Sequence, residues 1–133
     1  MAVMQQIMVD TSAYSAFLRG DTKLRPYFSS KNSITVPIIV IGELRAGFAT
    51  GNKQHENEDS LQKFLDSPNV EGVLLTDKTT QLYSAIYARL KATGNPINTN
   101  DIWIAALTLE HDSLLLTLDS DFSLVPDLLL AKF

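Results

Sequence analysis

The sequence predicts an α/β fold, organised as a three-layer α/β/α sandwich around a central, mostly parallel sheet. Short apolar or β-branched runs alternate along the chain with longer segments of helical spacing, and this alternation is typical of βαβ units. The chain has 133 residues, of which 45% are hydrophobic and 20% are charged, as in ordinary globular proteins. This length fits one domain, so we expect residues 1–133 to form a single domain.

Apolar or β-branched runs predict the strands of this sheet, and the helical spacing between them predicts the helices. The expected strands are residues 7–9, 33–36, 70–75 and 114–117, with a final edge strand at 128–130. The expected helices begin at Thr11 or Ser12, at Pro37, at Leu61, at Asp77 or Thr79, and at Asp101. Residues 52–59 and 93–100 are polar or rich in Gly, Asn and Pro, and we expect turns there.

Four acidic residues lie at the ends of these elements or among apolar neighbours. Asp10 follows the first expected strand, and Asp119 lies just after the strand at 114–117. Open α/β sheets place their sites at the carboxyl ends of their strands. Glu43 has apolar neighbours in the second helix, and Asp101 begins the most apolar helix of the chain. We therefore expect these four acids to form the functional site.

Clustered carboxylates have a defined chemistry. Two like charges about 4 Å apart repel by up to roughly 4 kcal/mol at an effective dielectric near 20, so such a cluster takes up protons or a cation. Oxygen ligands suit Mg²⁺ or Mn²⁺, whereas a chain with no cysteine and only two histidines is a poor candidate for zinc. A hard cation lowers the pKa of a water ligand and neutralises phosphate charge. The predicted reaction is therefore hydrolysis of a phosphate ester.

Each acid also has a purely structural explanation. Asp10 could be a helix cap, and Asp101 could simply complement the dipole of its helix. Asp119 and Asp121 could be ordinary turn residues. Glu43 fits such an explanation less well, because a glutamate among apolar residues needs a partner. A shared metal site accounts for the whole set with fewer separate assumptions.

The formal net charge of −4 is unfavourable for a protein that contacts phosphate. Metal-free carboxylates contribute to this count, and bound divalent ions would cancel part of it. Four basic residues also fall within one short stretch: Arg19, Lys23, Arg25 and Lys31. Residues 1–6 carry no basic residue, and residues 38–41 form the longest apolar run of the first half. We therefore expect a cytoplasmic protein without a signal peptide or membrane span.

Four motifs occur in order along the chain: VDTS at residues 9–12, IGELRAG at 41–47, PINTNDIWIAA at 96–106 and LTLDSDF at 116–122. Together they resemble the motifs of the PIN-domain ribonucleases, and more narrowly those of the VapC toxins of bacterial and archaeal toxin–antitoxin pairs. The resemblance extends over almost the whole chain. Each motif alone is weak, but four in order are specific, and the third is the most telling.

The resemblance implies a parallel-sheet α/β/α sandwich that binds Mg²⁺ or Mn²⁺. Asp10, Glu43 and Asp101 match the core acids of the family, and Asp119 matches its more variable fourth acid better than Asp121 does. The implied activity is an endoribonuclease that cleaves tRNA or another structured RNA and leaves a 5′-phosphate and a 3′-hydroxyl. The resemblance also implies a homodimer and inhibition by a cognate VapB-type antitoxin.

Roles for individual residues follow from this resemblance. Asp10 and Asp101 would bind the metal directly, Glu43 would act through a water, and Asp119 would complete the set or help to hold a second ion. Three neighbours could orient these carboxylates, although helix capping is an equal alternative: Thr11, Ser12 and Asn100. Arg45 could contact RNA or an antitoxin, or be an ordinary surface arginine. Trp103 is expected in the core, and His55 and His111 have no assigned role.

Other protein classes fit the sequence less well. A phosphatase of the haloacid-dehalogenase type needs a second aspartate two positions after the first, where this chain has Ser12. A response-regulator receiver needs a lysine after a late strand, and residues 117–119 do not supply it. Walker A and serine-hydrolase motifs are absent from the sequence. Related flap nucleases are generally larger, and the full acidic set argues against a degenerate PIN domain that serves only as an interaction module.

Overall fold

A central parallel sheet organises the protein, as the sequence predicts. The computed structural model describes residues 4–133. The expected absence of a signal peptide depends on residues 1–6, and the first three of these lie outside the described residues. The sheet has four strands in the order β3-β2-β1-β4, and each pair of neighbours is parallel. The strands are β1 (Gln6–Val9), β2 (Ser33–Pro37), β3 (Val70–Val73) and β4 (Leu114–Leu116).

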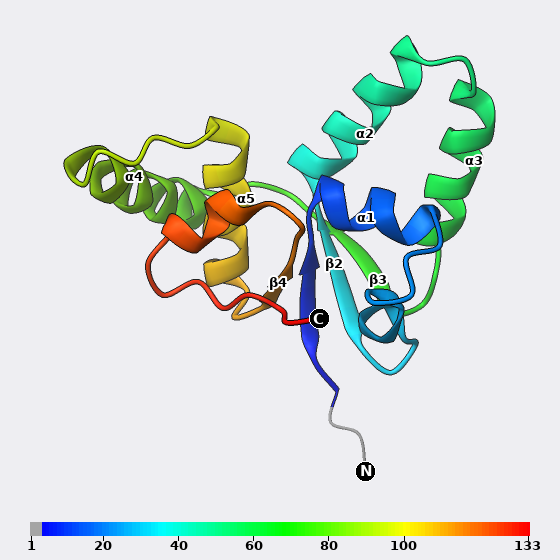
Figure 1. Cartoon of the computed structure of the whole chain (residues 1–133), viewed down its shortest axis with the longest axis horizontal. Helices are drawn as coiled ribbons and strands as arrows, with labels where there is room; N and C mark the ends of the chain where they lie inside the picture. The colour runs from blue at the N-terminus through cyan, green and yellow to red at the C-terminus, as the bar shows by residue number, and fades with distance from the viewer. Residues whose placement is uncertain (1–3) are drawn as a thin grey trace.

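Helices cover both faces of this sheet. The α-helices are α1 (Thr11–Leu18), α2 (Ile38–Thr50), α3 (Gln54–Leu65), α4 (Asp77–Ala92) and α5 (Thr99–Glu110), and the short 3-10 helices are η1 (Arg25–Phe28) and η2 (Ser120–Leu124). In Figure 1, α4 and α5 lie on one side of the strands, and α1 and α3 lie on the other. Within residues 4–133, no helix combines the length and apolar character that a membrane crossing requires.

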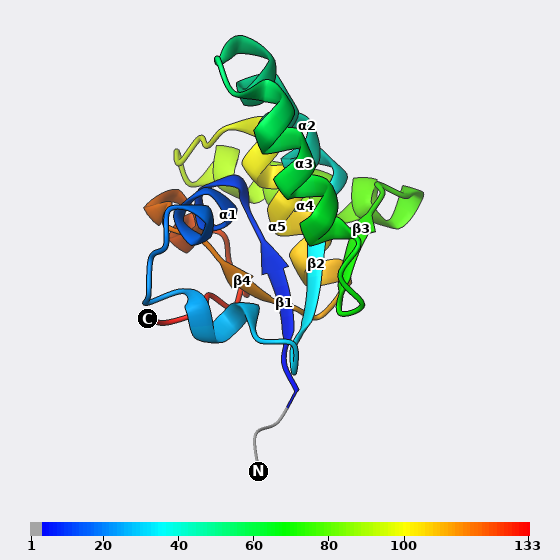
Figure 2. The same ribbon diagram turned by 90° about the vertical axis from the view of Figure 1, so that its right-hand side faces the viewer.

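The carboxyl ends of the strands meet at one end of the sheet, because all pairings are parallel. The helices α1 and α2 begin there, directly after β1 and β2. The hairpin formed by α2 and α3 extends beyond this end of the sheet (Figure 2). Residues from α1, from α2 and from the start of α5 line a cavity at this carboxyl end.

The central strand β1 is the most buried part of the sheet. Its residues Ile7, Met8 and Val9 are all 0% exposed, because the sheet has a helical layer on each face. The register pairs Ile7 with Leu114 and Val9 with Leu116 of β4. Strand β1 thus holds Asp10, the residue that follows it, in a fixed position relative to the end of β4.

One expected turn is wrong: most of residues 52–59 belong to α3, which begins at Gln54. Its first two turns are polar, and within the helix only Leu61 is buried, so the segment lacks the apolar periodicity that predicts a helix. Its N-cap residue, Lys53, makes no side-chain capping bond. The ion pair between Arg45 Nε of α2 and Glu58 Oε1, at 2.8 Å, is a tertiary contact that the local sequence does not reveal.

Several helix starts differ by a few residues from the prediction. Thr76, not Asp77 or Thr79, caps α4, and its hydroxyl and that of Thr79 bond reciprocally to each other's backbone N–H. A capping box with threonine rather than glutamate as its second member is easily overlooked. Helix α5 begins at Thr99, so Asp101 lies within its first turn instead of starting it.

The expected final edge strand is present only as a single bridge. Leu115 pairs in parallel with Leu130, with the Leu115 N–H donating to Leu129 O at 2.9 Å and the Ala131 N–H donating to Leu115 O at 2.8 Å. The C-terminal segment is thereby attached to the free side of β4, next to the carboxyl end of the sheet.

Truncating a buried leucine of β4 should destabilise the protein far more than truncating an exposed one. Leu115 is 0% exposed and Leu74 is 68% exposed. We expect Leu115→Ala to lower the free energy of unfolding by about 3 kcal/mol and Leu74→Ala by about 0.5 kcal/mol or less. Urea denaturation monitored by circular dichroism measures both values. Equal losses for the two variants would contradict the assignment of β4 to the core.

Candidate active site

Asp10 is fixed at the carboxyl end of β1 by hydrogen bonds to both of its carboxylate oxygens. Oδ1 accepts from the Ala13 N–H at 2.9 Å and from Ser12 Oγ at 2.8 Å, and Oδ2 accepts from Thr117 Oγ1 at 2.5 Å. The bond from Ala13 makes Asp10, rather than Thr11 or Ser12, the N-cap of α1. Burial raises the pKa of Asp10, and these three donors only partly oppose the effect.

Thr117 joins the ends of β1 and β4, and no sequence-based expectation gave it a role. Its hydroxyl donates to Asp10 and accepts from the Asp119 N–H at 3.0 Å. Ser12 makes a parallel connection, because its Oγ accepts from the Leu118 N–H at 3.0 Å. The signal for Thr117 was its place directly after β4, two residues before Asp119. Asp10 and Asp119 are thus connected through a shared threonine hydroxyl.

Glu43 has the partner that its apolar sequence neighbours require. It lies on α2 and is half-buried, and its Oε1 accepts from Thr11 Oγ1 at 2.8 Å. Thr11 is the first residue of α1 and Glu43 lies in the second turn of α2, so this bond connects two helices that follow neighbouring strands. The expectation that Thr11 orients a carboxylate agrees with this contact.

Asp101 comes to the same place from the opposite side, in the first turn of α5. Asn98 caps this helix, with its Oδ1 accepting from the Asn100 N–H at 2.8 Å. The pKa of Asp101 is raised to about 6, first because partial burial removes water from its carboxylate and then because Asp119, Glu43, Asp10 and Asp121 add negative charge around it. These four acids come from three separate segments of the chain, because Asp119 and Asp121 both lie at the start of η2.

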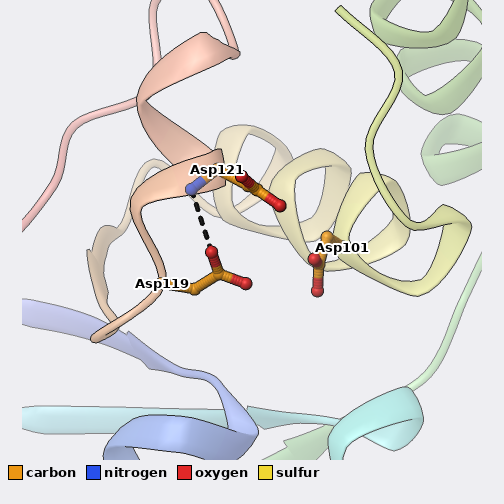
Figure 3. A group of neighbouring side chains, drawn as sticks. All are labelled: Asp101, Asp119 and Asp121. Carbon is orange, nitrogen blue, oxygen red and sulfur yellow. Dashed lines mark hydrogen bonds between the residues drawn. The ribbon is translucent and has the colours of Figure 1, made fainter.

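Three aspartates form the tightest group of acids at this end of the sheet. Asp101, Asp119 and Asp121 each present one oxygen within 4.8 Å of the others, and their side chains point toward one another in Figure 3. The Asp121 N–H donates to Asp119 Oδ1 at 2.9 Å, which makes Asp119 the N-cap of η2. One oxygen of Asp119 is thus held by the backbone.

A cavity of about 350 Å³ connects the acids. Its lining residues are Asp10, Thr11, Ser12, Ser15, Glu43, Asn98, Asp101, Ile104 and Asp119. Carboxylate, hydroxyl and amide oxygens dominate this set, and it includes no lysine or arginine, so the donors fit Mg²⁺ or Mn²⁺. Asp121 is not part of the lining, which favours Asp119 as the fourth acid. Asn98 lines the cavity, whereas the expected Asn100 does not.

The remaining candidates have contacts away from this cavity. Arg45 pairs with Glu58 on an exposed surface. Trp103 stacks on Tyr83 of α4 with ring centroids 4.0 Å apart, but it is half-buried and not one of the buried core residues, so its expected place in the core is wrong. His55 lies on the exposed surface of α3.

Comparison with protein families matches residues 7–128 to the PIN domain. Among curated proteins, the chain is 25% identical over 92 residues to "Ribonuclease VapC4" of Mycobacterium tuberculosis, a match that covers 69% of this chain and 71% of that protein. It is also 28% identical over 106 residues to "Ribonuclease VapC2" of Rickettsia felis, which covers 79% of this chain and 78% of that protein.

Solved structures share the same fold. The structure of VapBC2 from Rickettsia felis bound to a DNA fragment from their promoter contains a chain that superposes with a TM-score of 0.84. The two sequences are 24% identical, and the match covers 96% of this chain and 98% of the other. This likeness confirms the three-layer α/β/α architecture predicted from the sequence.

Replacing Asp101 with asparagine should stabilise the metal-free protein at neutral pH. In the folded state the pKa of Asp101 is about 6, above its ordinary value of 3.8. Protonated Asp101 therefore stabilises the fold fully below the ordinary pKa, and this stabilisation is lost as the pH rises through the folded-state pKa. Because solvent screens this half-buried group, we expect Asp101→Asn to gain only about 1 kcal/mol at about pH 7.5 in EDTA. The gain should disappear toward about pH 4.5.

Thermal denaturation of both proteins across this pH range provides the measurement. Asp59→Asn is the control, because Asp59 is an exposed acid of α3. A metal-free Asp101→Asn protein that is less stable than wild type at neutral pH would contradict the inferred repulsion.

Proposed function

The chain belongs to the PIN-domain family, and from this premise we propose that it is an endoribonuclease that depends on a divalent metal, Mg²⁺ or Mn²⁺. The observation that carries the proposal is the convergence of Asp10, Glu43, Asp101 and Asp119 on one cavity that lacks a cationic lining residue. Two relatives whose names include "Ribonuclease" support RNA as the substrate. We further propose that residues 1–133 act as a single domain.

The acids divide into two roles. Asp10, Asp101 and Asp119 are the residues that would hold the metal, with Asp121 as a neighbour able to contribute to a second ion. When bound, the ion neutralises charge on the scissile phosphodiester and makes a water more acidic. Since Thr117 and Ser12 hold Asp10, this carboxylate is oriented before any ligand arrives, which reduces the cost of assembling the site.

Glu43 is the candidate for orienting the attacking water. Thr11 donates to Oε1, so the second oxygen, Oε2, is available to accept a hydrogen bond from water. A carboxylate with one oxygen fixed has less rotational freedom, and a positioned general base contributes more than a mobile one. Thr11 therefore acts through Glu43 as a positioning residue.

The biological setting that we propose is a toxin–antitoxin pair. The chain would be the VapC-type toxin, neutralised by a VapB-type antitoxin, and would act as a cytoplasmic homodimer. The likeness to relatives named VapC and to a structure described as VapBC2 supports this assignment. RNA, with tRNA as the first class to examine, is the proposed substrate.

The decisive experiment is an RNA cleavage assay with purified protein and a pool of total tRNA. Wild type should cleave in Mg²⁺ or Mn²⁺ and lose activity in EDTA, and Asp10→Asn and Asp101→Asn should each reduce the rate by roughly 100-fold or more. Asp59→Asn, at an exposed position on α3, should retain wild-type activity. Folded protein that cleaves no RNA in either metal would contradict the proposal.

Asp119 and Asp121 should differ in their effect on cleavage. Asp119 lines the cavity and Asp121 does not, so we expect Asp119→Asn to reduce the rate roughly 100-fold and Asp121→Asn roughly tenfold or less. Initial rates at saturating metal compare the two variants directly. A larger loss for Asp121→Asn would reverse their assignment.

A further inference from the structure

A second cavity lies beside the acidic cavity, and the two share Asp119 as a common wall. Its volume is about 430 Å³. The lining residues are Thr117, Leu118, Asp119, Ser120, Leu130, Ala131, Lys132 and Phe133. We call this space the tail cavity, because the C-terminal segment forms half of it.

The C-terminal wall of the tail cavity is held by contacts with the body of the protein. Leu130 bridges to Leu115 of β4, and the Ala131 N–H donates to Leu115 O at 2.8 Å. The Tyr27 hydroxyl donates to Lys132 O, and the Tyr27 ring meets that of Phe133 edge-on with centroids 6.5 Å apart. The backbone of the segment is therefore anchored at both ends, and the Phe133 ring has a contact with the body of the protein.

The side chains around the tail cavity combine exposed apolar groups with a basic one. Leu118 and Phe133 are 45% and 50% exposed, although both are apolar. Lys132 is also exposed, and among the described residues it forms no ion pair within 4.0 Å. An exposed aromatic ring, an apolar side chain and an unneutralised cation within one cavity match the face of a base and the charge of a phosphate.

We propose that the tail cavity binds the nucleotide next to the scissile phosphate of single-stranded RNA, with Phe133 and Leu118 against the base and Lys132 near its phosphate. The inference rests on the proposed ribonuclease function. Because Asp119 borders both cavities, a strand with one phosphate at the acids can continue directly into the tail cavity. A cavity of this volume lies within the range typical of small-molecule sites.

The charge distribution of the chain favours Lys132 as a contact for RNA. The net charge is −4, and the acidic cavity has no lysine or arginine in its lining, so it repels RNA until metal is bound. Lys132 is the cation that lines the adjoining cavity. Arg25 belongs to η1, the same short helix as Tyr27, and Tyr27 contacts both Lys132 and Phe133.

The test compares RNA binding by Lys132→Gln and Phe133→Leu with binding by wild type. Each substitution is made in a Glu43→Gln background, in which the aspartates remain and turnover is expected to be slow. A fluorescent, random-sequence, short single-stranded RNA is titrated in Mg²⁺ at several salt concentrations, and anisotropy reports the Kd. Losing one phosphate contact should lower the slope of log Kd against log salt by about 0.7 for Lys132→Gln. Phe133→Leu should weaken binding roughly tenfold with an unchanged slope.

Matched controls separate this site from general effects of charge and aromatic content. Lys63→Gln removes an exposed cation from α3, which contacts the opposite edge strand β3. Tyr87→Leu removes an exposed aromatic ring from α4. Neither should alter the Kd by more than about twofold, whereas Lys132→Arg and Phe133→Tyr should restore binding.

Cleavage by the same variants with Glu43 intact provides a second readout. Phe133→Leu should raise KM while kcat stays near its wild-type value, because the ring contacts the substrate at a point remote from the reacting atoms. If wild type cleaves RNA but Lys132→Gln and Phe133→Leu match the controls, the tail-cavity inference is wrong and the ribonuclease function stands. If the variants lose binding but wild type cleaves nothing, the binding site stands and the proposed function is wrong. Absence of any RNA binding would overturn both.

Discussion

Repulsion among carboxylates is the constraint on which the rest of this structure depends. Partial burial of Asp101, and then the negative charge of the four acids around it, raise its pKa to about 6. The protein does not relieve the repulsion with lysine or arginine, because the cavity lining contains neither. Uncharged donors hold the acids instead: the hydroxyls of Thr117, Ser12 and Thr11. Hydroxyls fix the orientation of a carboxylate without cancelling its charge, so the cluster keeps its affinity for a divalent cation.

The parallel sheet makes such an arrangement possible. Parallel strands bring their carboxyl ends to one end of the sheet, and the buried strand β1, flanked by β2 and β4, holds Asp10 beside the segment that carries Thr117 and Asp119. The stability of this core offsets the free energy lost by gathering like charges. Sites that bind metals or substrates commonly reduce the stability of the empty protein in this way. The tail cavity is consistent with this arrangement. Lys132, the cation that would contact RNA, lies outside the acidic cavity and does not compete with a metal ion for the carboxylates.

The sequence predicted the elements that obey simple periodicity and the acids that follow them. Asp10 and Asp119 were predicted from their places after apolar strands, and Glu43 was predicted from a need for a partner that Thr11 supplies. The second half of α3 was predicted from the spacing that begins at Leu61, but its first half was missed because these turns are polar and contact α2 through the Arg45–Glu58 ion pair. Thr117 was missed because an uncharged residue after a strand has no distinctive pattern until the neighbouring strand is known. Asn98, rather than Asn100, lines the cavity because α5 begins earlier than the position of Asp101 suggested.

The most direct test of the central claim is to locate the metal itself. Crystals of the protein grown with Mn²⁺ and measured at a wavelength where manganese scatters anomalously would show the ion without reference to activity. We predict an anomalous peak among the carboxylates of Asp10, Asp101 and Asp119, and its loss in Asp101→Asn crystals. A fully occupied peak elsewhere, or none at millimolar Mn²⁺, would contradict the conclusion that these acids are gathered to bind a divalent cation.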